Sequence, residues 1–219
     1  MASPSVAADV RRRTARFNCA FPVPPPDVGG YKPRVPFEPK RNLPRLEKHH
    51  YQGHATVFWT LTLEERARGW LNPDFHRTFR ELMLHASVRY QVWCPTYCLM
   101  PDHLHLLWMG LRRASDQRNA MKFLRTELEP ALGEGRQWQH QPHDHVLREE
   151  ERKRNAYAQT CFYILANPVR AKLVTGNDRW PFAGCVVPGY PRLHPQDEDF
   201  WPLFWKLYVT DRDAEPPAP

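Results

Sequence analysis

Hydrophobic and polar positions follow a strand-like pattern in three stretches of the middle of the chain. Residues 54–63 (HATVFWTLTL) are rich in β-branched and aromatic side chains, which are typical of a strand. Residues 97–100 and 103–109 form two further apolar runs, and the turn-forming pair Pro101-Asp102 separates them. The pattern therefore predicts one strand followed, further along the chain, by a hairpin of two strands.

Three other segments repeat their apolar residues at helical spacing. The first begins at Asn72 or Pro73. Its apolar face would carry Phe75, Phe79, Leu82, Met83 and Ala86. The second follows Ser115, which we expect to be its N-cap. Its inward face would carry Ala120, Phe123, Leu124 and Leu128. The third runs from about residue 149 to residue 166.

A short run at residues 145–147 is a candidate for one more strand, which gives the order β, α, β, β, α, β, α. Strands interleaved with helices in this order favour an α+β fold. We expect a ferredoxin-like sandwich with a central antiparallel sheet.

The two ends of the chain differ from this regular region. Residues 1–50 form an N-terminal arm, rich in proline and basic residues, that cannot bury enough apolar surface to fold alone. Two uses of the arm stay open, a contact to DNA and a solubilising tail. We expect one domain over residues 51–190 and a C-terminal extension over residues 191–219, with a frayed tail from Asp211 onward.

Composition narrows the class of partner. The 219 residues carry a formal charge of +7, which favours an acidic partner, most commonly nucleic acid, although a merely soluble basic protein is the alternative. The sequence contains neither an apolar run long enough to span a membrane nor a secretory signal. Five cysteines, an odd number without metal-site spacing, indicate reduced core residues of a cytoplasmic protein.

The first candidate site is the pair His103 and His105. Alternate residues of a strand point to the same face, so the two imidazoles would lie side by side, with Cα atoms about 7 Å apart. Leu104, Leu106 and Trp108 would then point to the opposite, buried face. Such a pair can hold one divalent cation, and the alternative is two exposed histidines on the solvent face of a sheet.

A second pair with the same spacing, His143 and His145, has the charged Asp144 between its members and lies in a Gln- and Pro-rich region. We interpret it as a loop pair, which is a poorer template for a rigid metal site. His145 remains a candidate for a second-shell or substrate contact.

The second candidate site is Tyr163 with Asn167, which share a helical face at spacing i, i+4. The tyrosine could present its hydroxyl to a substrate, and the amide oxygen could complete the coordination of a metal. Two structural alternatives stay open. Tyr163 could be a core aromatic, and Asn167 could cap a short helix that begins at Pro168, which spacing alone favours.

These motifs together resemble the REP-associated tyrosine transposases, part of the single-tyrosine HUH class. The resemblance rests on PDHLHLL from residue 101, HDHVLRE from 143, YILANPVRAKLV from 163 and WPF from 180. It implies an HUH endonuclease fold in which His103 and His105 bind Mg²⁺ or Mn²⁺ with the help of Asn167. It further implies that Tyr163 attacks DNA and forms a 5′-phosphotyrosine, in a prokaryotic, nucleoid-associated enzyme that nicks and joins single-stranded or hairpin DNA.

The chain also departs from the family pattern. Leu165 stands where many relatives carry a histidine, Lys172 replaces a frequent glycine, and the N-terminal arm is unusual. These differences bear on the DNA target and on autonomous transposition rather than on the core chemistry.

Seven basic residues are candidates for contacts to a DNA backbone: Arg112, Arg113, Lys122, Arg125, Arg152, Arg154 and Arg170. The alternative for each is an ordinary solvated helix face. Three other functions also remain open: a metal-dependent nuclease that uses water, a non-catalytic DNA- or RNA-binding module, and a domesticated transposase with a host role. The sequence is compatible with a monomer and with a homodimer.

Overall fold

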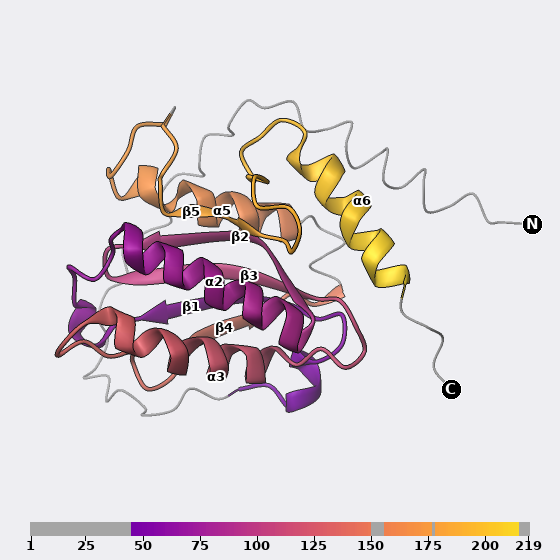
Figure 1. Cartoon of the computed structure of the whole chain (residues 1–219), viewed down its shortest axis with the longest axis horizontal. Coiled ribbons are helices and arrows are strands. Elements are labelled where there is room, and N and C mark those ends of the chain that lie inside the picture. Colours follow the sequence, from indigo (N-terminus) through magenta and orange to yellow (C-terminus); the bar gives the residue numbers. More distant parts are fainter. Residues whose placement is uncertain (1–44, 150–155, 177, 215–219) are drawn as a thin grey trace, which may run out of the picture. The chain divides into compact units, whose positions relative to one another are not determined.

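A computed structural model describes residues 45–149, 156–176 and 178–214. Most of the N-terminal arm, residues 1–44, therefore lies outside the described residues. The described chain contains a five-stranded antiparallel sheet with the order β4-β1-β3-β2-β5 (Figure 1). Its strands are β1 (Thr56–Thr62), β2 (Val92–Met100), β3 (His103–Gly110), β4 (His143–Val146) and β5 (Ala183–Val186).

The helices surround this sheet in the order expected from the sequence, with one addition. They are α2 (Pro73–Tyr90), α3 (Gln117–Leu128), α5 (Ala156–Arg170) and α6 (Phe200–Asp213), with the short 3-10 helices η1 (Lys48–Tyr51), η2 (Glu64–Arg66) and η3 (Glu129–Leu132). The predicted α+β fold is confirmed. Sequence periodicity did not predict β5 or α6.

Two helix starts can be compared with their predictions. Helix α2 begins at Pro73, within the predicted choice of Asn72 or Pro73, and the Asn72 side chain caps it by accepting a hydrogen bond from the backbone of Phe75. The prediction for α3 was wrong by one residue, since Asp116 accepts the hydrogen bond from Asn119 and is the N-cap. Ser115 is buried, and its hydroxyl instead donates to the carbonyl of Gln91.

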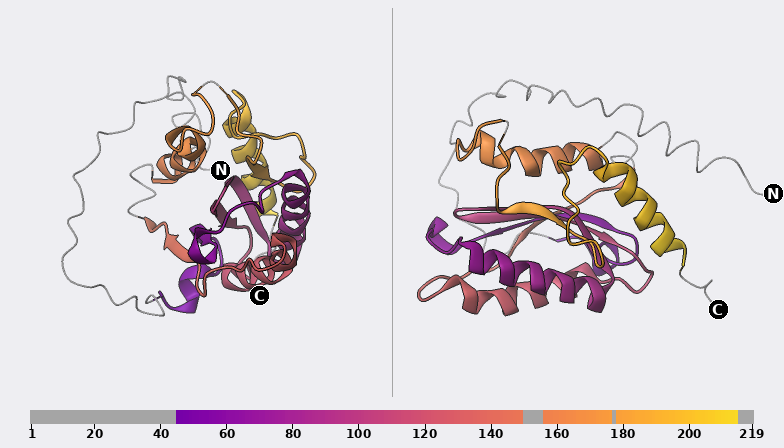
Figure 2. Two further views of the ribbon diagram at one scale, coloured as in Figure 1. Left: turned by 90° about the vertical axis from the view of Figure 1, so that its left-hand side faces the viewer. Right: turned by 45° about the horizontal axis from the view of Figure 1, so that its top comes forward.

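The sheet lies between two pairs of helices (Figures 1 and 2). Helices α2 and α3 cover one face, and their core cluster includes Leu104, Leu106 and Trp108 of β3. Helices α5 and α6 cover the other face, where Leu107 of β3 packs with Ile164 of α5. The alternation predicted for β3 is therefore confirmed, and it sets His103 and His105 on the face covered by α5.

The hairpin of β2 and β3 turns at Pro101-Asp102, as predicted, and pairs Met100 with His103. At the other end of β3, a side chain at Gly110 would collide with the backbone of Gly53, since a Cβ there would lie 1.8 Å from the Gly53 carbonyl oxygen. Glycine is required at this position because two backbones approach closely.

The described cysteines are free and buried, as expected: Cys94, Cys98, Cys161 and Cys185. They belong to the core clusters on the two faces of the sheet. None of the described helices combines the length and the apolar composition that a membrane span requires.

Candidate active site

The predicted histidine pair lies between the sheet and α5. His105 is only 6% exposed, and His103 is partly buried. The alternative of two histidines on a solvent-facing sheet is therefore wrong. The Nε2 atoms of the two rings face each other at 3.1 Å, so both imidazoles converge on one point.

The opposite nitrogen of each ring is held by a hydrogen-bond partner. Nδ1 of His103 lies 2.6 Å from Oδ1 of Asp102, and Nδ1 of His105 lies 2.9 Å from the Thr60 hydroxyl. A carboxylate only accepts, so His103 donates from Nδ1 and leaves the lone pair of its Nε2 toward His105. The Thr60 hydroxyl can donate or accept, so it can orient His105 in either tautomer.

Burial and nearby charges favour the neutral imidazole at His105. Burial, with the neighbouring His103 and Arg170, lowers the pKa of His105 to about 3. Burial alone would raise the pKa of Asp102, but the hydrogen bond from His103 and the charge of Arg66, 3.3 Å away, hold it below its ordinary value. At neutral pH, His105 is therefore an uncharged imidazole that can give an electron pair to a metal ion. The ionised carboxylate of Asp102 supports the neighbouring ring of His103.

This geometry fits two ligands of one divalent ion. Neighbouring ligand atoms about 2.1 Å from an octahedral ion lie about 3.0 Å apart, close to the separation of the two Nε2 atoms. The described residues contain no group of three His, Cys, Asp or Glu side chains arranged to hold a metal. If the described residues supply a third ligand to the metal, it would have to be an oxygen atom outside these four residue types, such as that of a side-chain amide.

Tyr163 lies against His105, one member of the histidine pair. Its ring lies 5.9 Å from the ring of His105 and 6.0 Å from Phe58 of β1, centroid to centroid, and both contacts are edge-on. Its side chain is 44% exposed, so the alternative of a core aromatic is wrong. Tyr157, another tyrosine of α5, instead packs against Trp201 and Trp205, and its hydroxyl is buried.

Asn167 lies one turn after Tyr163 and does not cap a new helix, because α5 continues through Pro168 to Arg170. The capping alternative is therefore wrong. Proline lacks the N–H that would bond to the carbonyl of Ile164. The amide of Asn167 donates to that carbonyl and, at 2.8 Å, to the carbonyl of Tyr163. Both contacts use Nδ2, so Oδ1 accepts no hydrogen bond from the described residues.

Arg170 is the predicted DNA contact that belongs to this site. Its guanidinium carbon lies 5.0 Å from the centroid of the Tyr163 ring, and its charge contributes to the lowered pKa of His105. The electron-rich face of the ring attracts this cation, which holds the two side chains together. Tyr163, His105 and Arg170 thus form one group, here called the tyrosine site.

The second histidine pair is not in a loop, which corrects our interpretation. His143 and His145 lie on β4, the edge strand, and both are exposed. His143 pairs with Thr60, and His145 pairs with Phe58. Paired residues share a face, so both histidines border the tyrosine site from one strand away.

The other predicted basic contacts lie elsewhere. Arg112 and Arg113 follow Gly110, at the opposite end of β3 from His103, and Arg112 forms an ion pair with Asp211 of α6 at 3.2 Å. Lys122 and Arg125 are on α3, across the sheet. The final two, Arg152 and Arg154, lie outside the described residues.

Three contributors were missed from the sequence: Asp102, Thr60 and Phe58. Asp102 directly precedes the histidine pair, but we interpreted it only as a turn residue. The alternation of β1 was sufficient to put Phe58 and Thr60 on one face. Only the pairing of β1 with β3 brings Thr60 opposite His105.

Comparison with known proteins adds a relationship to this geometry. No family model matches the chain. A Haemophilus influenzae protein named as a REP-associated tyrosine transposase is 23% identical over 154 residues, covering 64% of this chain and 85% of that protein. The chain resembles the REP-associated tyrosine transposases.

A solved structure of such a transposase, bound to a REP hairpin, has the same fold. It matches with a TM-score of 0.54 at 21% identity, over 65% of this chain and 81% of the transposase chain. The fold expected from the sequence motifs is therefore the fold observed.

Proposed function

We propose that this protein is a metal-dependent endonuclease and strand transferase for single-stranded, hairpin-forming DNA, with Tyr163 as its nucleophile. The observation that carries the proposal is the contact between two separate motifs. The exposed Tyr163 of α5 lies against His105, whose Nε2 meets that of His103. The resemblance to REP-associated tyrosine transposases supports the proposal.

The chemistry is a transesterification. The Tyr163 oxygen loses its proton and attacks the scissile phosphorus, and the bond from phosphorus to the 3′ oxygen breaks. The 5′ phosphate stays on the tyrosine, and the departing 3′ oxygen takes up a proton. Because the phosphoester energy is kept, a 3′-OH can reverse the step and join the strand without a nucleotide cofactor.

The surrounding residues support this step in distinct ways. Arg170, beside the tyrosine ring, can neutralise a phosphate oxygen. Phe58 packs against both Tyr163 and His105, which limits the movement of the two rings relative to each other. Asp102 and Thr60 fix the directions of the two imidazoles.

His103, His105 and Oδ1 of Asn167, which accepts no hydrogen bond from the described residues, are the groups that would hold Mg²⁺ or Mn²⁺. A bound divalent ion would polarise the scissile phosphate and stabilise its developing charge. Action on chromosomal hairpins would place the protein with the nucleoid of a prokaryotic cell.

The test is the covalent adduct. The protein is incubated with Mn²⁺ and a hairpin oligonucleotide with single-stranded flanks, labelled at either the 3′ or the 5′ end, and then denatured. A 5′-phosphotyrosine keeps the 3′-labelled fragment on the protein and releases the 5′-labelled fragment with a free 3′-OH. Cleavage without an adduct would favour the water-using nuclease, and binding without cleavage would favour the non-catalytic module.

The matched variants are Tyr163→Phe and Tyr157→Phe, which each remove one hydroxyl from the same helix. Only Tyr163→Phe should abolish the adduct, since the Tyr157 hydroxyl is buried. An adduct that persists in Tyr163→Phe would contradict the assignment.

A further inference from the structure

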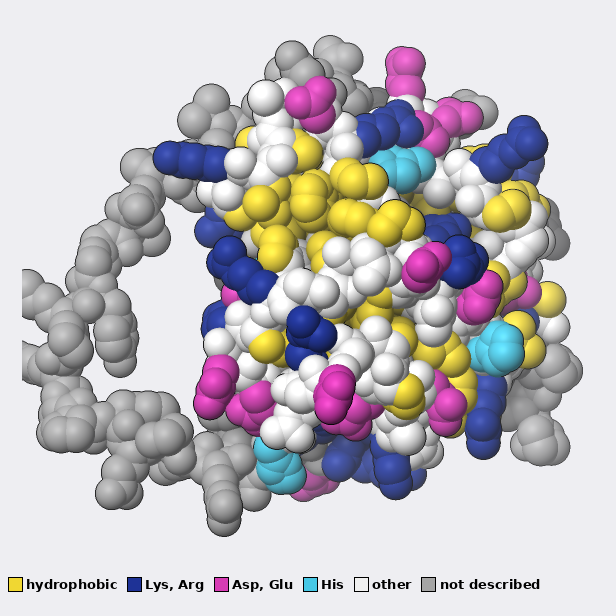
Figure 3. All heavy atoms as spheres, turned by 60° about the vertical axis from the view of Figure 1, so that its left-hand side comes forward, with side chains coloured by type: hydrophobic (Ala, Val, Ile, Leu, Met, Phe, Trp, Pro, Cys, Tyr) yellow, Lys and Arg dark blue, Asp and Glu magenta, His cyan; other side chains and the backbone are white. Residues whose placement is uncertain are grey.

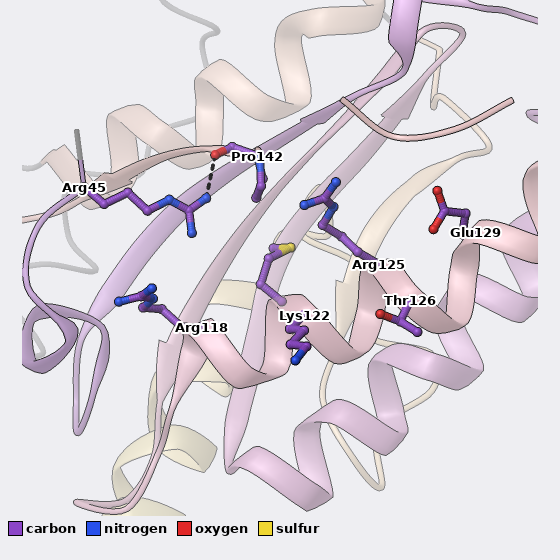
Figure 4. Close-up of a pocket in the computed structure, with 8 residues that line it drawn as sticks. Arg45, Arg118, Lys122, Arg125, Thr126, Glu129 and Pro142 are labelled. Atoms are coloured by element: carbon purple, nitrogen blue, oxygen red, sulfur yellow. Dashed lines mark hydrogen bonds between the residues drawn. The ribbon is translucent and has the colours of Figure 1, made fainter. Parts of the chain in front are cut away.

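A second basic site lies on the other side of the sheet from the tyrosine site. A cavity of about 280 Å³ opens between α3, the segment before η1 and the residues that precede β4 (Figure 4). Four cationic side chains line it: Arg45, Arg118, Lys122 and Arg125. Glu129 is the one acidic residue among the described lining.

Helical spacing explains how these cations come together. Arg118, Lys122 and Arg125 leave α3 on successive turns, at i, i+4 and i+7, and so share one face of the helix. The opposite face of α3 carries the buried Ala120, Leu124 and Leu128, so packing orients the basic face toward the cavity. Arg45 forms the other wall and donates to the carbonyl of Pro142 at 2.9 Å.

The charges in this cavity are incompletely neutralised. Arg45 pairs with Asp144 at 3.3 Å, but Arg118, Lys122 and Arg125 form no ion pair with any residue that the structure describes. Arg125 bonds instead to the backbone carbonyls of Gln139 and His140. On the face shown in Figure 3, basic and acidic side chains are interspersed.

Two guanidinium Nε atoms of the cavity lining, those of Arg45 and Arg125, are buried without a hydrogen bond to the described residues, and only that of Arg45 lies in an ion pair, with Asp144. Burial lowers the pKa of Arg125, the charge of Glu129 raises it, and the nearby charge of Arg45 lowers it. An anion between the two guanidinium groups would offset this repulsion.

We propose that this cavity, here called the α3 pocket, binds a phosphate group, and that in the cell the phosphate belongs to the backbone of the bound DNA. Guanidinium and ammonium donors converge here, and three of the four have no carboxylate partner among the described residues, which matches the needs of a phosphate diester. The assignment to DNA rests on the proposed function, whereas the anion site itself does not.

Edge strand β4 connects the α3 pocket with the tyrosine site. His143 and His145 point to the face that carries Tyr163, and Asp144 between them points to the other face, where it bonds Tyr51 and Arg45. A DNA molecule held at both sites would therefore pass around the edge of β4. The α3 pocket would anchor the duplex stem while the single strand reaches Tyr163.

The test compares two charge-matched double variants in the Tyr163→Phe background, where DNA is bound but not cut. Arg118→Gln/Lys122→Gln removes two cations from the α3 pocket. Arg192→Gln/Lys206→Gln removes the same two residue types from exposed positions outside it. Hairpin affinity is measured at several salt concentrations, and binding of inorganic phosphate is measured by calorimetry at constant ionic strength.

The α3-pocket variant should bind the hairpin roughly tenfold more weakly and lower the salt slope by about 2, since each lost phosphate contact lowers it by about 1. Phosphate binding should also disappear in this variant alone. Equal losses in both double variants would overturn the site. Lost phosphate binding with unchanged DNA affinity would overturn the DNA assignment in favour of a free phosphate ion.

Two controls separate this result from other failures. The single variant Lys122→Gln changes an exposed side chain, so it should reproduce part of the affinity loss with an unchanged thermal midpoint. The adduct assay on the wild-type protein reports the proposed function separately. An α3-pocket effect without any adduct would therefore refute the nuclease and keep the anion site.

Discussion

The ring of Tyr163 meets the ring of His105 edge-on at 5.9 Å between centroids. Helix α5 supplies one residue and the central strand β3 the other. His105 is buried beneath this contact, while the tyrosine remains exposed. A substrate can therefore approach Tyr163 from solvent while the imidazole below it stays shielded, which is the arrangement that the proposed transesterification needs.

Replacing either histidine of the first pair should remove metal binding. His103→Ala and His105→Ala each delete one of two Nε2 atoms that converge at 3.1 Å, so Mn²⁺ affinity should fall by at least tenfold in calorimetric titration. His143→Ala changes an exposed histidine on the same face of the sheet and should bind Mn²⁺ like the wild type. Unchanged affinity in both strand variants would refute the metal site.

The partners of the histidine rings should tune that affinity. Thr60→Val keeps the shape of the side chain but removes the hydroxyl 2.9 Å from Nδ1 of His105. We expect Mn²⁺ affinity to fall roughly tenfold, because partners that orient metal ligands typically contribute this much. Thr210→Val makes the same change on α6, where the hydroxyl bonds only a helix carbonyl, and should leave the affinity unchanged. Equal effects of both variants would exclude a role for Thr60.

How much of this site the sequence could predict depends on the range of the interactions. Asn72 and the alternation of β3 were predictable because caps and strand faces are local properties. The order of His103, Tyr163 and Asn167 was informative because two motifs together resemble one family. Each of these predictions needed only nearby residues or a recognised motif.

Long-range packing decided the rest. Helix α6 was not predicted. Its residues Phe200, Phe204 and Tyr208 recur at helical spacing and pack into the core, but a run of aromatic residues near the end of the chain does not by itself distinguish a helix from a strand. The continuation of α5 through Pro168 was also not predictable, since the Asn167 amide replaces part of the lost backbone bonding. The α3 pocket needed Arg45 and α3 to meet across the fold.

The stability of the fold should decrease as the pH falls through the range in which His76 is protonated in the unfolded chain but neutral in the folded protein. Burial and the charge of Arg80 lower the pKa of His76 from 6.5 to about 4. Between those values the unfolded chain takes up a proton that the folded protein does not, so stability is full above about pH 6.5 and is lost toward pH 4. In His76→Gln, the drop in thermal midpoint between pH 7 and pH 4.5 should be smaller.

His85→Gln is the matched control for this measurement. His85 lies on the same helix but is exposed, so its replacement should leave the pH dependence of the thermal midpoint as in the wild type. Identical curves for the wild type and His76→Gln would mean that the burial of His76 does not contribute to acid sensitivity.

DNA binding should prefer hairpins with single-stranded flanks over a blunt duplex. An exposed Tyr163 beside Arg170 can meet a flexible strand, whereas a rigid duplex cannot fold around the β4 edge. Affinity should also fall steeply with salt, because phosphate contacts release counterions. Fluorescence anisotropy with oligonucleotides of equal length measures both effects, and equal affinity for the blunt duplex at every salt concentration would contradict the proposed function.

The N-terminal arm should strengthen DNA binding without being needed for folding. The folded part begins before residue 50, because Arg45 pairs with Asp144 and Lys48 with Asp116, both at 3.3 Å. A truncation must therefore stop earlier, and the compact unit beginning at Asn42 gives the boundary. Residues 1–41 still contain eight basic residues: Arg11, Arg12, Arg13, Arg16, Lys32, Arg34, Lys40 and Arg41.

Deleting residues 1–41 should leave the thermal midpoint within about 2 °C of the full chain, since the ion pairs of Arg45 and Lys48 are kept. Hairpin affinity should fall and its salt slope should become shallower, because extended basic arms can follow a phosphate backbone. A large drop in the midpoint would mean that these residues stabilise the core. An unchanged salt slope would mean that the basic residues of the arm make no phosphate contacts, which would leave the role of a solubilising tail.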